Sequence, residues 1–308
     1  MKVAIIGGTG FVGTYIVEAL LERDHQPVLL VRPGSEGKVA YREQCTLVPG
    51  KVQDVEALRH TLEGCDAAIY NIGILREFKS KGITFEELQY RGAARTMDVA
   101  VKTGVKRFLL MSANGVKADG TAYQTTKYRA EQHVKATELD WTIFRPSVMF
   151  GDPRGKMEFC TQLQQQLINP PLPAPLFYEG LLPLDAGSFL MAPIHVKDVA
   201  TAFSKSLTMP ETVHQTYGLC GPETFDWKTI IQILAKASGK HKLALPVPAF
   251  MVKSAAAMLD QFEFFPLSQE QLTMLLEGNA CDSSEAFRLF EITPTPFNEN
   301  SLSYLSRD

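Results

Sequence analysis

The chain has 308 residues, 45% of them hydrophobic, so it can bury one large core or the cores of a large and a small domain. Its 31 basic and 34 acidic residues leave a formal charge of -3, which excludes a broad basic surface for nucleic acid. No run approaches the roughly 18 to 20 apolar residues that span a bilayer, so we expect a globular cytoplasmic protein without a transmembrane segment.

The opening residues MKVAIIGG are too short and too rich in glycine for the apolar segment of a signal peptide. The cysteines are widely spaced, with no CxxC pair and no paired spacing of metal ligands. This pattern predicts reduced, mostly buried thiols and no metal site. The five cysteines are Cys45, Cys65, Cys160, Cys220 and Cys281.

In the first half of the chain, short apolar runs rich in β-branched residues alternate with stretches of helical periodicity. The runs predict buried strands at 2–6, 27–32, 45–48, 67–73, 107–112 and 141–145. The periodic stretches predict helices at 14–23, 54–62, 85–102 and 122–137. This alternation predicts the α/β class, with a Rossmann-type doubly wound parallel sheet and helices on both faces.

The composition changes after about Gly151. Residues 169–187 are dense in proline, which argues against a long helix or a central strand and predicts an ordered loop. Residues 192–207 predict a strand that leads into a helix, and 226–240 and 247–262 predict further helices. We therefore expect a Rossmann domain at 1–150 and a smaller, mostly helical lobe at 151–308, part of which returns to the main sheet.

Gly7, Gly10 and Gly13 lie between the first strand and the first helix, in the spacing G-x-x-G-x-x-G. In a dinucleotide site such glycines allow a tight turn, a close approach of the backbone to pyrophosphate, and close packing of helix on strand. The helix N-terminus then presents free N–H groups to phosphate. A tight turn without a ligand is the alternative, but the position at the first strand favours nucleotide binding.

The end of the second strand distinguishes between the two nicotinamide cofactors. An NAD site carries a carboxylate here for the ribose 2′-hydroxyl, whereas this strand ends in Arg32. A guanidinium suits a 2′-phosphate, so NADP(H) is favoured and NAD(H) stays open. The alternative is an ordinary surface arginine.

Tyr123 and Lys127 are four residues apart on one face of a predicted helix. A phenol is a poor acid or base at neutral pH, and an ammonium one turn away favours the phenolate and can also bind a ribose. Such a pair occurs often by chance. Its place after the fifth strand gives it weight, because ligands of open α/β sheets lie at the carboxyl edge.

The glycine turn, Tyr123-x-x-x-Lys127 and FRPSVMFG at 144–151 together resemble the short-chain dehydrogenase/reductase superfamily in its extended or atypical form, over essentially the whole chain. PIHVKDVATA at 193–202 resembles the segment that opens the C-terminal region of extended members. More narrowly, 69–77, 104–115, and the tail segments 266–279 and 290–297 resemble the group of the NAD(P)H-binding accessory subunit of respiratory complex I and its bacterial relatives.

The resemblance implies a role for each matching residue. The implied cofactor-binding residues are Gly7, Gly10 and Gly13 at the pyrophosphate, Thr9, Phe11 and Val12 in the loop, Arg32 at the 2′-phosphate, Asn71 and Gly73 beside the adenosine ribose, and Pro146 and Ser147 with backbone groups for the nicotinamide amide. Tyr123 would be the general acid/base and Lys127 its electrostatic partner.

Two positions depart from the family pattern. Lys51 stands where the family has an acidic residue that faces adenine. Ser112 is a candidate for the catalytic serine, but the favoured alignment puts Ala113 at that position, with Asn114 as a substitute donor. Loss of a serine donor removes a contact that is typically worth a few kcal/mol of barrier. Catalysis is therefore less firmly implied than cofactor binding.

Three other signals are interpreted as structural. A lone His195 and the helix-terminal Asp198 are ordinary features of a core and a helix start. The aromatic and Met residues of 250–265 have the spacing of a core helix, with a partner or membrane surface as the alternative.

We therefore predict an NADPH-dependent oxidoreductase that reduces a carbonyl-type group of a small apolar molecule. The alternatives are a non-catalytic NAD(P)H-binding protein of structural, assembly or redox-sensing function, and an NAD-dependent sugar-nucleotide epimerase or dehydratase. The predicted partner is a small-molecule substrate or a protein; a homodimer and a peripheral membrane contact stay open.

Overall fold

The computed structural model describes residues 1–259 and 268–306. The chain divides into two compact units. The first unit contains 1–146, 196–219 and 283–293, and the second contains 147–195, 220–282 and 294–308. The second half of the chain therefore contributes segments to both units. Residues 260–262 of the predicted helix and the aromatic residues at 262–265 lie outside the described residues.

The first unit is built on a parallel sheet whose central strands are mainly apolar, because helices cover both faces. In β1, the residues from Val3 to Ile6 are fully buried. All neighbouring pairs are parallel. In spatial order the seven strands of this sheet are β11 (Gln215–Leu219), β6 (Asp140–Pro146), β5 (Arg107–Met111), β4 (Ala67–Tyr70), β1 (Lys2–Ile6), β2 (Gln26–Val31) and β3 (Thr46–Pro49).

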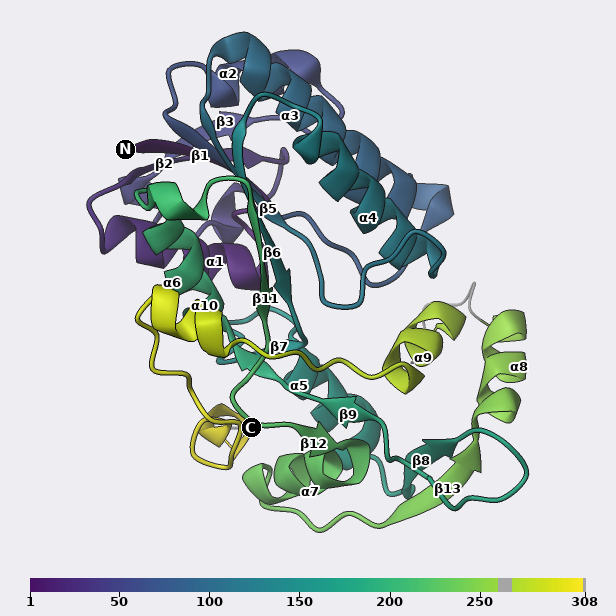
Figure 1. Ribbon diagram of the computed structural model, residues 1–308. Helices are drawn as coiled ribbons and strands as arrows, with labels where there is room; N and C mark the ends of the chain where they lie inside the picture. Colours follow the sequence, from purple (N-terminus) through teal and green to yellow (C-terminus); the bar gives the residue numbers. More distant parts are fainter. Residues whose placement is uncertain (260–267, 307–308) are drawn as a thin grey trace. The chain divides into compact units, whose positions relative to one another are not determined.

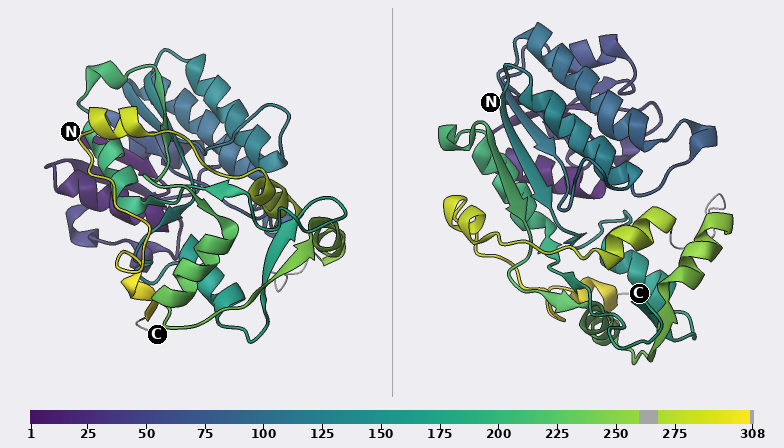
Figure 2. Two further views of the ribbon diagram at one scale, coloured as in Figure 1. Left: turned by 60° about the horizontal axis from the view of Figure 1, so that its bottom comes forward. Right: turned by 45° about the vertical axis from the view of Figure 1, so that its right-hand side comes forward.

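Helices α1 and α6 pack together on one face of this sheet, and α2, α3 and α4 lie on the other (Figures 1 and 2). Side chains alternate accordingly: Ala4 and Ile6 of β1 belong to the core cluster that includes Leu58 of α2 and Met97 of α3. A π-helix, Glu86–Arg91, runs directly into α3. The helices of this unit are α1 (Phe11–Leu21), α2 (Val55–Leu62), α3 (Gly92–Thr103), α4 (Ala122–Lys135), α6 (Val196–Ser206) and α10 (Ser284–Leu289).

The second unit combines short two-stranded pairings with helices around the buried ring of Trp227. The pairings are β7 (Met149–Phe150) with β10 (Ile194–His195), β9 (Leu190–Met191) with β12 (Phe225–Asp226), and β8 (Ala174–Tyr178) with β13 (Ala244–Pro248). The helices are α5 (Phe159–Leu163), α7 (Trp227–Ala237), α8 (Ala249–Leu259) and α9 (Gln269–Leu276). The indole of Trp227 donates to Pro175 O at 2.9 Å, which fixes α7 on β8.

The structure corrects two expectations. The proline-rich segment 169–187 is not all loop, because Ala174–Tyr178 form strand β8. Pro175 is tolerated there since each strand of a two-stranded ribbon is an edge strand. The cysteines are also not all reduced: Cys220 and Cys281 form a disulfide, with Cα atoms 5.6 Å apart, while Cys45, Cys65 and Cys160 are free thiols. Their separation of 61 residues gave no signal of this pairing.

The predicted fold class is confirmed by the parallel seven-stranded sheet with helices on both faces. The helix predicted to follow the glycine turn begins at Phe11, with Gly10 as its N-cap. Within the described ranges, no helix has both the length and the hydrophobicity to cross a membrane.

Candidate active site

Gly7 and Gly13 are required by the geometry of the turn between β1 and α1. Gly7 has φ +102°, and a Cβ there would lie 2.9 Å from the backbone carbonyl of Asn71. A Cβ on Gly13 would lie 2.2 Å from Gly7 O, because the first turn of α1 packs directly on the loop. These glycines let the turn approach β4 and the helix approach the turn.

Gly10 is different, because no such constraint acts on it. Its backbone is extended (φ -80°), the residue is exposed, and the nearest atom to an added Cβ is Gly7 O at 3.7 Å. Helix α1 has no side-chain cap and no acidic residue in its first turn, so its N–H groups suit an anion. The turn therefore fits a pyrophosphate, which a side chain at position 10 would obstruct. Thr9, Phe11 and Val12 border the same turn and are half-buried.

Arg32 follows the last residue of β2, and its side chain is exposed. In the sheet register, Ile6 of β1 is opposite Leu30 of β2. Arg32 therefore leaves the sheet at the level of Gly8, on the same edge as the glycine turn. Lys51, just past β3, is also exposed on this side of the sheet.

The residues after β4 connect the glycine turn with helix α4. Asn71 donates its backbone N–H to Ile6 O at 2.8 Å and its side-chain amide to Gly7 O at 3.4 Å. Gly73 lies beside Lys127, since a Cβ added to it would be 3.7 Å from Lys127 Nζ. Thus Gly7, Asn71, Gly73 and Lys127 form one continuous edge of the first unit.

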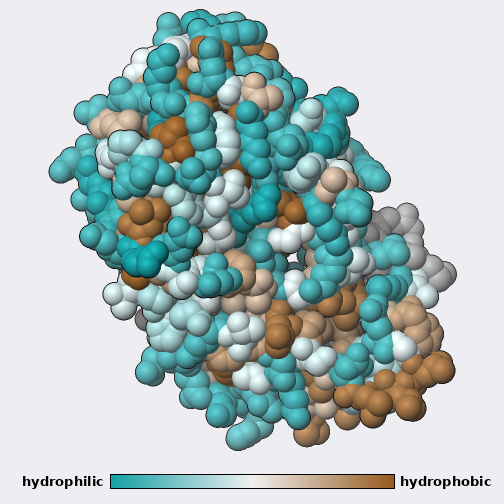
Figure 3. Space-filling model, in the orientation of Figure 1, coloured by the Kyte–Doolittle hydropathy of each residue, from teal (hydrophilic) through white to brown (hydrophobic). Residues whose placement is uncertain are grey.

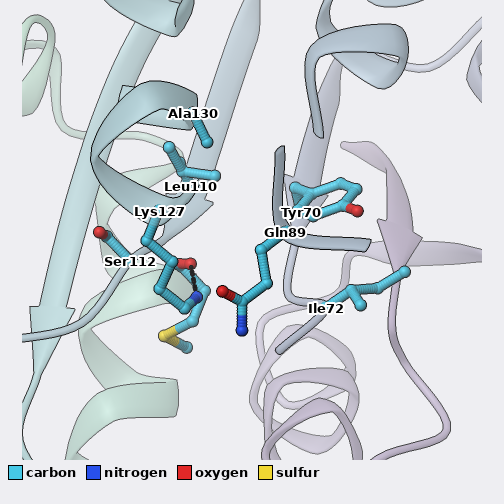
Figure 4. Close-up of a pocket in the computed structure, with 8 residues that line it drawn as sticks. Tyr70, Ile72, Gln89, Leu110, Ser112, Lys127 and Ala130 are labelled. Atoms are coloured by element: carbon cyan, nitrogen blue, oxygen red, sulfur yellow. Dashed lines mark hydrogen bonds between the residues drawn. The ribbon is translucent and has the colours of Figure 1, made fainter. Parts of the chain in front are cut away.

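Helix α4 presents Tyr123 and Lys127. It begins with a capping box in which Thr121 and Gln124 bond each other's backbone N–H groups. Lys127 is buried, and its Nζ donates to Met111 O at 3.0 Å (Figure 4) and lies 5.8 Å from the centroid of the Tyr123 ring. Burial lowers the pKa of Lys127 to about 8, against the opposing effect of Glu131.

Tyr123 is half-buried and packs edge-to-face on Phe85, with ring centroids 5.8 Å apart. Burial raises the pKa of the phenol above its ordinary value. The phenol is therefore protonated at neutral pH, so the site holds a proton donor next to an ammonium group.

Ser112 lies in an internal hydrogen-bond network. Its hydroxyl is buried and donates to Glu131 Oε1 at 2.5 Å, and Arg145 bonds both oxygens of the same carboxylate. Arg145 thereby forms a two-point contact with this buried carboxyl group. The Ser112 hydroxyl thus donates its proton inside the protein, and its catalytic role stays a prediction.

Glu131 and Gln89 are two site residues that the sequence analysis missed. Glu131 is one turn beyond Lys127, so the spacing Tyr123, Lys127, Glu131 along one face could have revealed it. Gln89 lies in the π-helix, where its amide donates to Ile74 O at 2.8 Å and accepts from Thr126 Oγ1 at 3.0 Å. It lines the small pocket beside Lys127, together with Tyr70 and Ile72 (Figure 4). No composition signal marks this residue.

The remaining predicted residues lie where the chain passes from the first unit to the second. Pro146 ends the first unit, and its carbonyl accepts the N–H of Asn114 at 2.8 Å. Ser147 begins the second unit and donates its hydroxyl to Ala192 O at 2.5 Å. The ring of His195, also in the second unit, packs edge-to-face on Phe150 at 5.0 Å.

Comparisons with known proteins agree with this geometry. Residues 7–167, just over half of the chain, match the family described as NAD(P)H-binding. The chain is 24% identical over 314 residues to the 40 kDa subunit of NADH-ubiquinone oxidoreductase of Neurospora crassa, covering 98% of this chain and 78% of the relative. It is also 24% identical over 259 residues to the ceramide reductase of Caulobacter vibrioides, covering 84% of this chain and 77% of the relative.

Among solved structures, that of gox2253 superposes with a TM-score of 0.75 at 22% identity, covering 99% of this chain and 96% of that chain. This likeness shows a common fold. The family match includes the glycine turn, the ends of β4 and β5, and helix α4, which are the segments that form the edge described above. The chain therefore belongs to the NAD(P)H-binding family, within the short-chain dehydrogenase/reductase superfamily.

Proposed function

We propose that this protein is an NADP(H)-dependent reductase that acts on a carbonyl-type group of a small apolar molecule. The observation that carries the proposal is the position of Lys127, whose ammonium lies beside Gly73, Met111 O and the Tyr123 ring. These groups are at the carboxyl edge of the sheet, where open α/β proteins bind ligands.

The cofactor would be held along this edge. Gly10 and the first turn of α1 would hold the pyrophosphate, and Arg32 the 2′-phosphate through a charge-assisted contact. Asn71 and Gly73 would border the adenosine ribose, and Lys127 the nicotinamide ribose. Backbone groups of Pro146 and Ser147 would bind the nicotinamide amide. When bound, the reduced cofactor supplies the hydride.

The chain would supply the proton. Tyr123 Oη, protonated at neutral pH, would donate to the carbonyl oxygen as negative charge develops there. With a pKa of about 8, Lys127 is mostly ammonium at pH 7, and its charge lowers the free energy of the phenolate that remains. The phenolate then recovers a proton from solvent.

An apolar substrate is favoured by the leucine, proline and phenylalanine content of 170–190, which offers few charged groups to a sugar nucleotide. One relative is named a ceramide reductase, which supports both a reductase activity and an apolar substrate. A sugar-nucleotide epimerase would instead call for NAD, and Arg32 argues against that preference.

The test is Tyr123→Phe, assayed for NADPH oxidation with a panel of apolar aldehydes and ketones. Loss of the proton donor should lower kcat/KM by about 10² to 10⁴-fold while calorimetry shows unchanged NADPH binding. Tyr128→Phe, five residues further along α4 and on another face of the helix, is the matched control. If Tyr123→Phe turns over substrate as fast as the parent, Tyr123 is not the proton donor and the proposed mechanism is wrong.

A second function is favoured by Ala113 at the position of the family serine and by the engagement of Ser112 with Glu131. On this alternative the protein binds NAD(P)H without catalysis and contributes to a larger assembly. The Neurospora crassa relative is named as a subunit of such an assembly, NADH-ubiquinone oxidoreductase. Reduced cofactor that co-purifies and is not oxidised by any carbonyl in the panel would favour it over the reductase.

A further inference from the structure

Large apolar side chains that are exposed to solvent are concentrated in one region of the second unit. This apolar ribbon surface comprises the β8–β13 ribbon, the loop after β8 and the first turn of α8. Figure 3 shows hydrophobic residues gathered there, at the lower right. In the described part of the first unit, the exposed large hydrophobic residues are spread over separate elements. The exposed leucines are Leu245 in β13, Leu181, Leu182 and Leu184 in the loop, and Leu172 and Leu243, which come just before β8 and β13 and belong to the same surface.

The parts of the apolar ribbon surface are held together by specific contacts. Ala174 donates its N–H to Leu243 O at 2.8 Å, which aligns the two strands. The loop is closed by Gly187 N–H on Phe177 O at 2.8 Å. An ion pair of 3.1 Å between Lys253 and Glu179 joins α8 to the start of this loop. The exposed leucines therefore lie on a defined surface.

The tip of the loop projects into solvent to an unusual degree. Leu181, directly after Gly180, is 98% exposed, and Leu184, directly after Pro183, is 90% exposed. A folded protein partner must provide a pocket of matching shape for such side chains. Fluid hydrocarbon accepts them without shape complementarity, as it does the apolar side chains of other interfacial segments. Phe250, 65% exposed at the start of α8, adds an aromatic ring of the kind found at the headgroup boundary.

The charges around this surface are complementary to anionic headgroups. Lys240 donates to Asn169 Oδ1, and Lys242 to the carbonyls of Ile168 and Pro170, so both ammonium groups contact neutral oxygens. Segments 168–187 and 240–254 hold three lysines and two carboxylates, whereas the whole chain has an excess of acidic residues. The surface is thus locally positive on a negative protein, which favours an anionic bilayer.

We propose that the apolar ribbon surface docks on an anionic lipid bilayer, with the leucines of the loop 180–184 inserted at the headgroup–acyl boundary and Lys240 and Lys242 among the headgroups. The proposal is independent of the reductase function, and cofactor binding serves below only as a check on folding.

The experiment is co-sedimentation of the full chain with vesicles of phosphatidylcholine alone and of phosphatidylcholine with phosphatidylserine. We expect the protein to bind the anionic vesicles and to bind the neutral vesicles more weakly. Added salt should weaken binding to the anionic vesicles. The double variant Leu181→Glu/Leu184→Glu should bind about 100-fold more weakly, at roughly tenfold per leucine. Leu75→Glu, which changes a half-exposed leucine of the first unit, is the matched control.

Both variants are also measured for thermal unfolding and for NADPH binding, which should equal those of the parent. The proposal is overturned if the parent fails to sediment with anionic vesicles, or if Leu75→Glu weakens sedimentation as much as the double variant. It is also overturned if light scattering finds a dimer that the double variant abolishes while vesicle binding is absent, because the surface would then face a second copy of the chain.

Discussion

Gly10 and Gly13 are in the same turn for different reasons, and substitution by alanine can distinguish a role in packing from a role in ligand binding. A methyl group on Gly13 would meet Gly7 O at 2.2 Å, so Gly13→Ala must displace backbone and should cost about 1 to 3 kcal/mol of stability. A methyl group on Gly10 meets nothing closer than 3.7 Å, so Gly10→Ala should change stability by less than about 1 kcal/mol.

Gly10 is also the position at which a methyl group should affect ligand binding. Gly10→Ala should weaken NADPH binding at least about tenfold, because the methyl group occupies the approach to the pyrophosphate. Urea unfolding and calorimetry on both variants provide the measurement, each glycine being the control for the other. A folded Gly10→Ala variant that binds NADPH like the parent would show that the turn is not the phosphate site.

Arg32 should determine the preference of the protein for NADPH over NADH. Removing a charged hydrogen bond to the 2′-phosphate costs about 1.5 to 3 kcal/mol, so Arg32→Ala should weaken NADPH binding by that amount and leave NADH binding unchanged. Calorimetric titration of both cofactors checks this, with Arg288→Ala, an exposed arginine of α10, as the control. An equal loss of affinity for NADPH and NADH would show that Arg32 does not bind the 2′-phosphate.

Lys127 should make stability depend on pH with a defined sign. Its pKa in the folded protein is about 8, below the ordinary value of 10.5. Between these values the unfolded chain binds more protons, so this residue's contribution to stability rises with pH. At pH 7 the buried charge costs about 3 kcal/mol, reduced by roughly 1 kcal/mol for the hydrogen bond to Met111 O.

Lys127→Met should accordingly be more stable than the parent at pH 7, by about 1 to 3 kcal/mol, and should lose this advantage as the pH approaches 10.5. Urea unfolding at several pH values measures the difference, with Lys102→Met on the exposed face of α3 as the control. A difference that does not change with pH would contradict the lowered pKa.

Helix α4 is the element that organises the candidate site, and much of it was predictable. The spacing of Tyr123 and Lys127 predicted a common face, and the capping box at Thr121 explains where the helix begins. The period of two along β5 could also have directed Ser112 toward α4, since Phe108 and Leu110 face that side. The hydrogen bond between Ser112 and Glu131 could not be predicted from local sequence, because it depends on how α4 is positioned along the sheet.

Other elements show why local sequence was insufficient. Six of the seven strands of the main sheet were predictable because burial on both faces gives continuous apolar runs, whereas β11 begins with polar, exposed residues and was not predicted. β8 was missed because its prolines were interpreted as evidence against a strand, although proline is excluded only from central strands. Its partner β13 also lies about 70 residues away in sequence, so no local pattern indicated the pairing. The π-helix that places Gln89 beside Lys127 has no compositional signature.

At the scale of the whole molecule, the disulfide between Cys220 and Cys281 is the main covalent constraint beyond the chain itself. It closes a loop with a sequence separation of 61 residues, for which chain entropy predicts a stabilisation of about 4 kcal/mol, with 2 to 4 kcal/mol typical of measured cases. Reduction, or the variant Cys220→Ser/Cys281→Ser, should therefore lower the free energy of unfolding by 2 kcal/mol or more.

Thiol titration in denaturant independently tests the disulfide, because it counts the free cysteines. Without reductant, three thiols should react, those of Cys45, Cys65 and Cys160, and all five should react after reduction. Cys45→Ser should titrate one thiol fewer in both states and keep the full loss of stability on reduction, because Cys45 is not part of the bond. Five reactive thiols before reductant, in protein isolated under conditions that block exchange, would mean that the pair stays reduced in its compartment. The second unit would then be held by non-covalent contacts only, among them the Trp227 core and the β8–β13 pairing, and reductant should leave its unfolding unchanged.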